Sequence, residues 1–297
     1  MTDSLGEVAA ITHRLAVLLG AGVAPASAWR HVAVGAASAV PAAAVASGPA
    51  GIPDAIVAAA TGGDAPARQA WRGLAAAWAV ATDAGAPLAP SLTSYAGSLR
   101  ALADAQRDVR VALAGPRSTA RIVMVLPAIG VLFGLALGFD TLGVLLTTPP
   151  GWICVAVGGA LILVARQWSR RLLRSAEPPD ATPGLDHDLA AIAVSGGGAL
   201  DRAVAAVREA GARYGISVGA LDATLDLSRR AGVPAGELLR GEAEERRRVA
   251  RADAQERAAA LSVRLMLPLG LCVLPAFMVL GVLPLLIAVV SSTVGTF

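Results

Sequence analysis

Apolar residues run without interruption near the end of the chain, from Leu265 to Val290, and this segment contains no charged side chain. A helix needs roughly 20 apolar residues to cross a bilayer, so the segment is long enough to do so. Pro268, Pro275 and Pro284 lie inside it. A proline inside a helix in water costs about 3 kcal/mol, but neighbouring helices in a membrane can satisfy the carbonyls that it frees. We expect a transmembrane helix that is kinked or packed against others; a buried helix of a soluble core is the alternative.

Two further apolar runs precede this one. Residues 122–146 are interrupted only by Asp140, and residues 152–165 follow the turn Pro149-Pro150-Gly151. The pattern predicts three transmembrane helices, of which the first two form a hairpin over residues 122–165. We expect Asp140 to lie at the outer membrane interface, and a functional carboxylate inside the membrane is the alternative.

Small residues form a stripe in the first of these spans. Gly130, Gly134 and Gly138 lie four residues apart, on one face of a helix. Small residues at this spacing allow two helices to approach closely in lipid. We predict that this stripe, together with Pro275, packs spans or protomers against one another. The alternative is that the three glycines reflect composition, since the chain contains 32 of them.

Outside these runs, apolar residues recur at helical spacing, so the expected fold class is all-α. In the first segment Leu5, Val8, Ile11 and Leu15 form one apolar stripe. The predicted helices cover residues 4–30 with a break at Gly22, 65–83, 92–113, 187–211, 216–230 and 237–264. Residues 33–64 are rich in alanine, glycine and proline, and they predict a loop with one short helix.

The arginines predict how the chain is oriented in the membrane. The arginines that flank the three spans are Arg117 and Arg121 before the first, Arg166, Arg170, Arg171 and Arg174 after the second, and Arg264 before the third. The loop 140–150 and the segment after Val290 contain no basic residue. The positive-inside rule then places the N-terminus and residues 166–264 in the cytoplasm, with the C-terminus outside. We therefore expect a multi-pass membrane protein.

Composition excludes several kinds of chemistry. The sequence is 55% hydrophobic, and every one of its 25 lysine-or-arginine positions is arginine. Without lysine there is neither a Walker A phosphate loop nor a lysine Schiff base. Cys154 and Cys272 lie inside apolar runs, where they predict neither a disulfide framework nor a zinc site. The first residues lack the basic and apolar regions of a signal peptide, so we expect no cleaved signal.

The two halves of the sequence resemble each other. AGAPLAPSL at residues 84–92 is similar to AGVPAGELL at residues 231–239, ADAQ occurs at 103 and 252, and LPA at 126 and 274. These pairs follow one order at nearly one offset, which predicts an internal duplication. A glycine turn that opens a helix is expected four times, at Gly22, Gly85, Gly197 and Gly232. Each copy would comprise a cytoplasmic helical bundle, a long charged helix and a membrane helix.

One motif suggests catalysis, but its context does not. Residues 215–219 fit G-x-S-x-G, the nucleophile elbow of hydrolases. That motif needs a strand before it and a histidine after it, whereas here a helical pattern precedes it and His13, His31 and His187 all lie upstream. Gly196-Gly197-Gly198 has no following lysine and is expected to be a helix break. We predict no catalytic, cofactor-binding or metal-binding residues and hence a protein that is not an enzyme.

The duplicated bundles, the glycine turns and the span RLMLPLGLCVLPAFMVLGVLPLL resemble the F-domain membrane proteins of type II secretion and type IV pilus systems. Within that family the chain is most similar to the TadB- and TadC-type proteins of tight-adherence pili. The resemblance covers most of the chain and is strongest over residues 185–290. It implies a cytoplasmic helical domain over residues 1–121, the hairpin 122–165, a second cytoplasmic domain over 166–264 and the span 265–290.

The resemblance also implies a function and partners. Such proteins form the inner-membrane platform of a pilus or secretion machine. The implied partners are a cytoplasmic ATPase that drives the machine, a second F-domain protein, pilin subunits and the lipid bilayer, in a homo- or hetero-oligomer; nucleic acid is not expected. The candidate contacts with the ATPase are arginines of the two charged helices, namely Arg107, Arg110, Arg246, Arg247, Arg248 and Arg251. The alternative is that these arginines only solvate a helix or touch anionic lipid.

Two other functions are compatible with the sequence. A small transporter would need polar residues at the membrane midplane, and the three apolar runs contain almost none. A membrane scaffold unrelated to pili remains open, although a duplicated unit favours a protein that transmits load.

Overall fold

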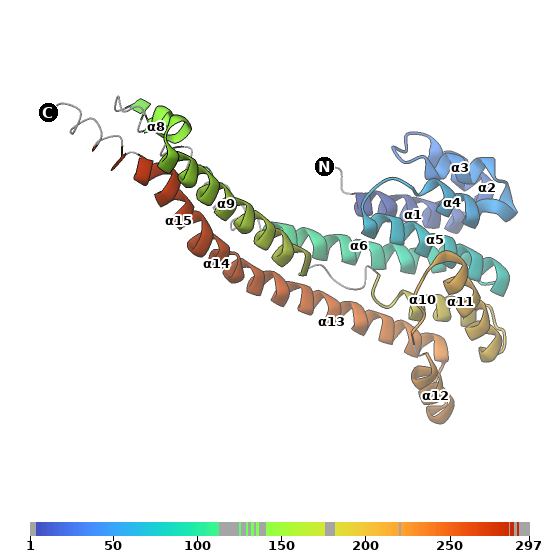
Figure 1. The fold of residues 1–297 in the computed structure, drawn as a ribbon. Coiled ribbons are helices and arrows are strands. Elements are labelled where there is room, and N and C mark those ends of the chain that lie inside the picture. The colour runs from blue at the N-terminus through green and yellow to red at the C-terminus, as the bar shows by residue number, and fades with distance from the viewer. Residues whose placement is uncertain are drawn as a thin grey trace. The chain divides into compact units, whose positions relative to one another are not determined.

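The computed structural model describes residues 4–112, 125, 129, 132–133, 135–136, 141–175, 182–219, 221–284, 286–287 and 290. Within these residues every regular element is a helix and none is a strand (Figure 1), which confirms the predicted all-α class. The chain forms two compact units. Unit 1 comprises Met1–Arg107 with Pro178–Ala252, and unit 2 comprises Asp108–Glu177 with Asp253–Phe297.

Unit 1 is built from ten α-helices and a short 3-10 helix, counted over its described residues. They are α1 (Ser4–Gly20), α2 (Pro25–Ala33), α3 (Val40–Ala46), η1 (Pro49–Gly51), α4 (Ile52–Ala59), α5 (Ala65–Ala84), α6 (Leu88–Ala112), α10 (Leu185–Ser195), α11 (Leu200–Tyr214), α12 (Asp222–Ala231) and α13 (Ala235–Arg264). The last residues of α6 and the second part of α13 belong to unit 2. The long charged helix predicted over 237–264 is α13 and begins two residues earlier.

Several helix boundaries follow from local chemistry. All four glycines that the sequence singles out adopt positive φ, with 85° at Gly22, 65° at Gly85, 78° at Gly197 and 67° at Gly232. Each lies between two helices, because a left-handed residue at the C-terminus ends a helix and glycine has no Cβ to oppose it. The side chain of Asp64 caps α5 by accepting a hydrogen bond from the Ala67 amide at 3.1 Å.

Two predictions about helix boundaries were incomplete, and a predicted helix break is confirmed. Residues 33–64 contain the two helices α3 and α4 and the 3-10 turn η1, where one short helix was expected. The helical stretch predicted over 187–211 is divided into α10 and α11 at Gly196-Gly197, where the run of three glycines predicts a break. The helix predicted over 216–230 begins only at Asp222. In residues 33–64 and at the start of α12 the sequence carries too little apolar contrast to mark the boundary.

A single hydrophobic core holds unit 1 together, with α5 at its centre. Helix α5 packs against α1, α4, α10 and α11, and it buries Trp71, Leu74 and Trp78 among others. The rings of Trp29 and Trp78 lie 5.6 Å apart in a tilted arrangement. The same cluster of buried side chains extends from Leu5 to Leu239. The two segments that the sequence suggests as separate cytoplasmic domains therefore share one core.

Unit 2 contains the apolar helices. Its described elements are α8 (Thr141–Thr147), α9 (Pro149–Ser175), α14 (Met266–Pro268), the π-helix η2 (Leu269–Val273), α15 (Leu274–Phe277) and the π-helix η3 (Met278–Val282). Helix α9 packs against η2, α15 and η3, so an apolar helix from the middle of the chain lies beside one from its end (Figure 1).

The π-helical turns coincide with prolines. A proline ring inside an α-helix clashes with the carbonyl four residues earlier. For Pro275 that carbonyl belongs to Leu271, inside η2, and for Pro284 it belongs to Leu280, inside η3. A π-turn is wider than an α-turn and leaves space for the ring. The two prolines therefore explain why the C-terminal apolar segment alternates between α- and π-helix.

Two helices of the described chain are long and apolar enough to cross a membrane, Pro149–Leu173 and Ala235–Val282. In the most apolar 18-residue stretch of each helix, only 22% and 35%, respectively, is buried. Side chains such as Trp152, Ile153 and Leu271 are exposed. A core helix of a soluble protein is mostly buried, so this exposure favours a lipid-facing surface. Most of the span predicted over 122–146 lies outside the described residues, as do Gly130, Gly134, Gly138 and Asp140.

The contact between α9 and η3 predicts a sharp effect of mutation. A Cβ at Gly158 would overlap with the side chain of Leu280, whereas a Cβ at Gly159 would meet nothing within 4 Å. We expect Gly158→Leu to destabilise unit 2 by about 1–3 kcal/mol through overpacking. In mild detergent, the buried Cys154 and Cys272 of this variant should react with a maleimide dye at a lower temperature than in the unmodified protein. Gly159→Leu is the matched control, and equal temperatures for both variants would contradict the predicted packing.

Candidate functional site

The arginines predicted to contact a partner divide into two groups. Arg246 and Arg247 of α13 are turned toward two aspartates of α10. The Arg247 Nη1 atom lies 2.8 Å from Asp188 Oδ2, and the Arg246 Nη1 atom lies 3.7 Å from Asp186 Oδ2. Arg246 also donates to Glu242 at 3.2 Å, one turn earlier in α13. Both arginines are thus paired with carboxylates of unit 1, and 41% of the Arg246 side chain and 21% of the Arg247 side chain remain exposed.

Asp186, His187 and Asp188 form a buried polar cluster at the start of α10. Its first half centres on Asp186. One oxygen of Asp186 accepts hydrogen bonds from the backbone N–H of His187 at 2.9 Å and from its ring Nδ1 at 2.8 Å. The other oxygen accepts from the backbone N–H of Gly219 at 3.0 Å. Burial by itself would raise the pKa of Asp186, but the bonds from His187 and Gly219 outweigh it and lower the pKa below its ordinary value.

The second half of the cluster centres on Asp188, which is 3% exposed. Its Oδ2 atom accepts from Ser98 Oγ of α6 at 3.0 Å and from Arg247 of α13 at 2.8 Å. Burial raises the pKa of Asp188, and the Arg247 charge and these hydrogen bonds offset only part of that effect. Asp188 thereby joins three helices, α6, α10 and α13, that are far apart in the sequence. This ion pair was not predicted; an Asp-His-Asp run at the start of an apolar helix is its only sequence signal.

An aspartate bound to a histidine Nδ1 is a feature of catalytic triads, but this pair lacks the rest of one. The His187 side chain is fully buried, and its Nε2 has no hydrogen-bond partner in the described residues. No serine or cysteine is paired with it in the described chain. A ring nitrogen enclosed in this way has no access to a substrate. Outside α10, Asp186 contacts the Gly219 backbone and Arg246 of α13.

The remaining predicted arginines lie on the surface. Arg248 pairs with Glu245 of the same helix at 2.9 Å, and Arg251 donates to the backbone carbonyl of Ala101 in α6 at 2.9 Å. Arg110 is exposed in the last turn of α6. Arg107 lines a shallow groove of about 260 Å³ between α1 and α6.

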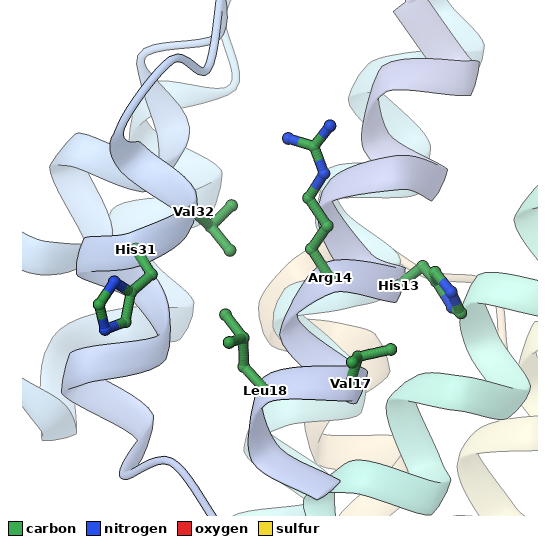
Figure 2. Close-up of a pocket in the computed structure, with 6 residues that line it drawn as sticks. All are labelled: His13, Arg14, Val17, Leu18, His31 and Val32. Carbon is green, nitrogen blue, oxygen red and sulfur yellow. The ribbon is translucent and has the colours of Figure 1, made fainter. Parts of the chain in front are cut away.

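Two grooves flank helix α1. The groove between α1 and α6 is lined by Gly6, Ala9, Ala10, Arg100, Ala103, Asp104 and Arg107. The groove between α1 and α2 has a volume of about 310 Å³ and is lined by His13, Arg14, Val17, Leu18, His31 and Val32. Figure 2 shows Leu18 and Val32 facing each other across it, while Arg14 points toward its upper end. Their walls are apolar or small, and their charged residues are mostly basic.

Neither a metal site nor a nucleophile elbow is found in the described residues. No group of three or more histidine, cysteine, aspartate or glutamate side chains is placed to hold a metal. The G-x-S-x-G segment follows helix α11, and Gly215 ends that helix with a φ of 68°. It is therefore not the strand-to-helix turn that the hydrolase motif requires.

No protein family, curated protein or solved structure matches the chain.

Proposed function

We propose that this protein is a non-enzymatic platform of a bacterial inner membrane, in a machine that assembles a type IV pilus of the tight-adherence type or drives related secretion. The observation that carries the proposal is the repeated order of helices in unit 1. In each half, two helices joined by a glycine turn are followed by a second such pair, whose last helix is long. The first half contains the pairs α1–α2 and α5–α6, and the second half contains α10–α11 and α12–α13. Helices α3 and α4 form an insertion in the first copy.

The two long helices support this interpretation. Helix α6 has 25 residues and begins three residues after Gly85, and α13 has 30 residues and begins three residues after Gly232. Each leads along the sequence toward an apolar run. A duplicated unit whose two halves each end in a helix directed to the membrane is suited to transmit motion between a cytoplasmic partner and the bilayer.

The proposal includes three membrane spans, with the N-terminus and residues 166–264 in the cytoplasm and the C-terminus outside. The distribution of arginine around the apolar runs supports this topology. A reporter that works only in the cytoplasm should be active when fused at residue 180 and inactive at residue 295. A reporter that works only outside the membrane should show the reverse. The opposite pattern would exclude the topology.

The proposed platform works with other proteins. The absence of lysine from the sequence leaves no Walker A loop, so the energy would come from a separate cytoplasmic ATPase. The other proposed partners are a second membrane protein of the F-domain type and pilin subunits that the platform lifts from the bilayer. The exposed apolar side chains of α9 and of the segment from α14 to η3 offer the surface for lipid and for such helices.

The test is a pull-down of the tagged full-length protein from its own cells in mild detergent, with partners identified by mass spectrometry. Co-purification of a secretion-type ATPase and a second membrane protein with duplicated helical bundles is the expected result. Recovery of the protein alone, under conditions that keep other membrane complexes intact, would favour a transporter subunit or an unrelated scaffold.

A further inference from the structure

Helix α9 and the C-terminal apolar segment of unit 2 run antiparallel, and two contacts define how they are aligned. Ala165 of α9 lies in one buried cluster with Cys272. Further along α9, Leu172 packs against the cluster that contains Leu265. The same number of residues, seven, separates the two contacts on either segment. The stretch between these contacts is therefore about 10 Å long on both segments.

We call this stretch, residues 166–172 of α9 beside residues 265–271, the arginine layer. The exposed side chains of the two segments differ within it. Those of α9 include three arginines, namely Arg166, Arg170 and Arg171. Those of the C-terminal segment include apolar side chains, namely Met266, Leu267 and Leu271. Basic and apolar side chains are thus exposed at the same level of unit 2.

The charge of this layer is not offset within the described part of the chain. Four exposed arginines form no ion pair there, namely Arg166, Arg170 and Arg171 of the layer and Arg264 directly before residue 265. Residues 149–175 and 257–290 contain neither aspartate nor glutamate. The four guanidinium groups are therefore open to an anion from outside these two segments.

On both segments, exposed apolar side chains lead into an arginine along one face. On α9, Leu163 is 67% exposed, and Arg166 and Arg170 follow it at spacings of three and four residues. On the other segment, Arg264, Leu267 and Leu271 follow one another at the same spacings. Since the two segments are antiparallel, both faces change from apolar to basic toward the same end of unit 2.

This order of chemistry matches a phospholipid, in which acyl chains lead to a phosphate. An acidic peptide would pair with the arginines but leave Leu163, Leu267 and Leu271 in water, where apolar surface is unfavourable. Trp168 is also exposed in the layer, and tryptophan is enriched where a membrane meets water. A guanidinium group can donate two parallel hydrogen bonds to a phosphate. The layer therefore fits a lipid headgroup better than a protein partner.

We propose that the arginine layer, together with Arg264, binds the phosphate groups of anionic phospholipids whose acyl chains cover Leu163, Leu267 and Leu271. A basic cluster beside membrane helices attracts anionic headgroups. Phosphatidylglycerol carries a net negative charge, whereas the choline of phosphatidylcholine neutralises its phosphate, so the layer selects phosphatidylglycerol. The inference rests on the membrane insertion contained in the proposed function, and it does not depend on the pilus or secretion machine.

The test reconstitutes the purified full-length protein in vesicles of phosphatidylglycerol and phosphatidylcholine in equal amounts. Flotation of the vesicles after an alkaline wash establishes that the protein is inserted. The protein is then extracted in mild detergent, and native mass spectrometry measures the ratio of the two lipids that it retains. Glycerol phosphate, which has the phosphate but no acyl chain, is added as a competitor.

Four double variants accompany the unmodified protein. R166Q/R170Q and R171Q/R264Q each remove two of the four charges, and R166K/R170K keeps both. R202Q/R240Q is the matched control, because it removes the same charge from exposed arginines of unit 1. Reaction of the buried Cys154 and Cys272 with a maleimide dye on heating establishes that unit 2 of each variant is folded.

We expect the unmodified protein to retain phosphatidylglycerol over phosphatidylcholine by about fivefold or more, and this preference to fall below about twofold in both glutamine variants. In R166K/R170K and R202Q/R240Q the ratio should stay within about twofold of the unmodified protein. Glycerol phosphate should not displace the retained lipid. Equal retention of the two lipids, a preference that survives in the folded glutamine variants, or displacement by glycerol phosphate would each overturn the inference.

The outcomes also separate this inference from the proposed function. Protein that fails to insert into the vesicles would refute the proposed membrane location together with the inference. Inserted protein without a lipid preference would refute the inference alone. A pull-down that recovers no ATPase would count against the platform and leave a measured lipid preference in place.

Discussion

Replacing Gly184 by alanine is expected to destabilise unit 1 by about 3 kcal/mol or more. Gly184 precedes α10 with a φ of 76°, a conformation that costs an L-residue about 1–2 kcal/mol. A Cβ at this position would also lie 2.6 Å from the carbonyl oxygen and 2.9 Å from the Cα of Ala243 in α13. Both atoms belong to a helix backbone, so they cannot rotate away as a side chain would. Strain and overlap therefore add at this position.

Gly197→Ala is the matched control for this prediction. Gly197 has nearly the same φ, 78°, but a Cβ there would meet nothing within 4 Å. It should show only the backbone strain of about 1–2 kcal/mol. Urea unfolding of the full-length protein in mild detergent, followed by the fluorescence of Trp29, Trp71 and Trp78 in unit 1, measures both variants. Equal losses would show that α10 does not pack against the α13 backbone as described.

The second prediction is that Arg247→Met destabilises unit 1 by about 3 kcal/mol at pH 7.5, with a smaller loss at pH 5. Removing one partner of a buried ion pair leaves the other charge without compensation. Asp188 would keep only its hydrogen bond from Ser98. Because the Arg247 charge lowers the pKa of Asp188 against the effect of burial, its removal raises that pKa further.

The sign of the pH dependence follows from this raised pKa. Between the ordinary aspartate value of about 3.9 and the higher value in the folded state, folded protein binds more protons than unfolded protein. Stability therefore decreases as the pH rises through this range, and the range extends further upward in Arg247→Met. As the pH falls through this range, a growing fraction of Asp188 in the variant is protonated and needs no cation, so the loss is smaller at the lower pH.

Urea unfolding at pH 5 and pH 7.5 measures this difference in the same detergent. Arg248→Met is the control, because Arg248 is exposed and pairs only with Glu245 of its own helix. It should leave stability unchanged at both values of pH. A loss in Arg247→Met that is independent of pH would show that Arg247 contributes by packing and that its charge on Asp188 is unimportant.

The contacts of Asp188 link the two long helices of unit 1. Ser98 and Arg247 bind the same oxygen of Asp188, and Arg251 binds the carbonyl of Ala101, so α6 and α13 are linked in unit 1. These are the two helices that lead along the chain toward apolar runs. In the proposed function, this link makes the two halves of unit 1 move together.

The sequence by itself determined the features that depend on neighbouring residues. Helical spacing of apolar residues marks α1 and α5, and glycine between two helical segments marks the turns at Gly22, Gly85, Gly197 and Gly232. The apolar lengths of α9 and of the C-terminal segment mark two helices that can cross a membrane. These signals are readable because helix periodicity and glycine φ are local properties of the chain.

Only the tertiary structure decided which residues far apart in the sequence meet. Arg247 and Arg248 are adjacent and chemically identical, yet one lies against the buried Asp188 and the other is exposed, because the rotation of α13 against α10 selects between them. Gly158 and Gly159 differ in the same way, since only Gly158 faces Leu280. Such properties depend on packing between helices, and the sequence of one helix does not record its neighbours.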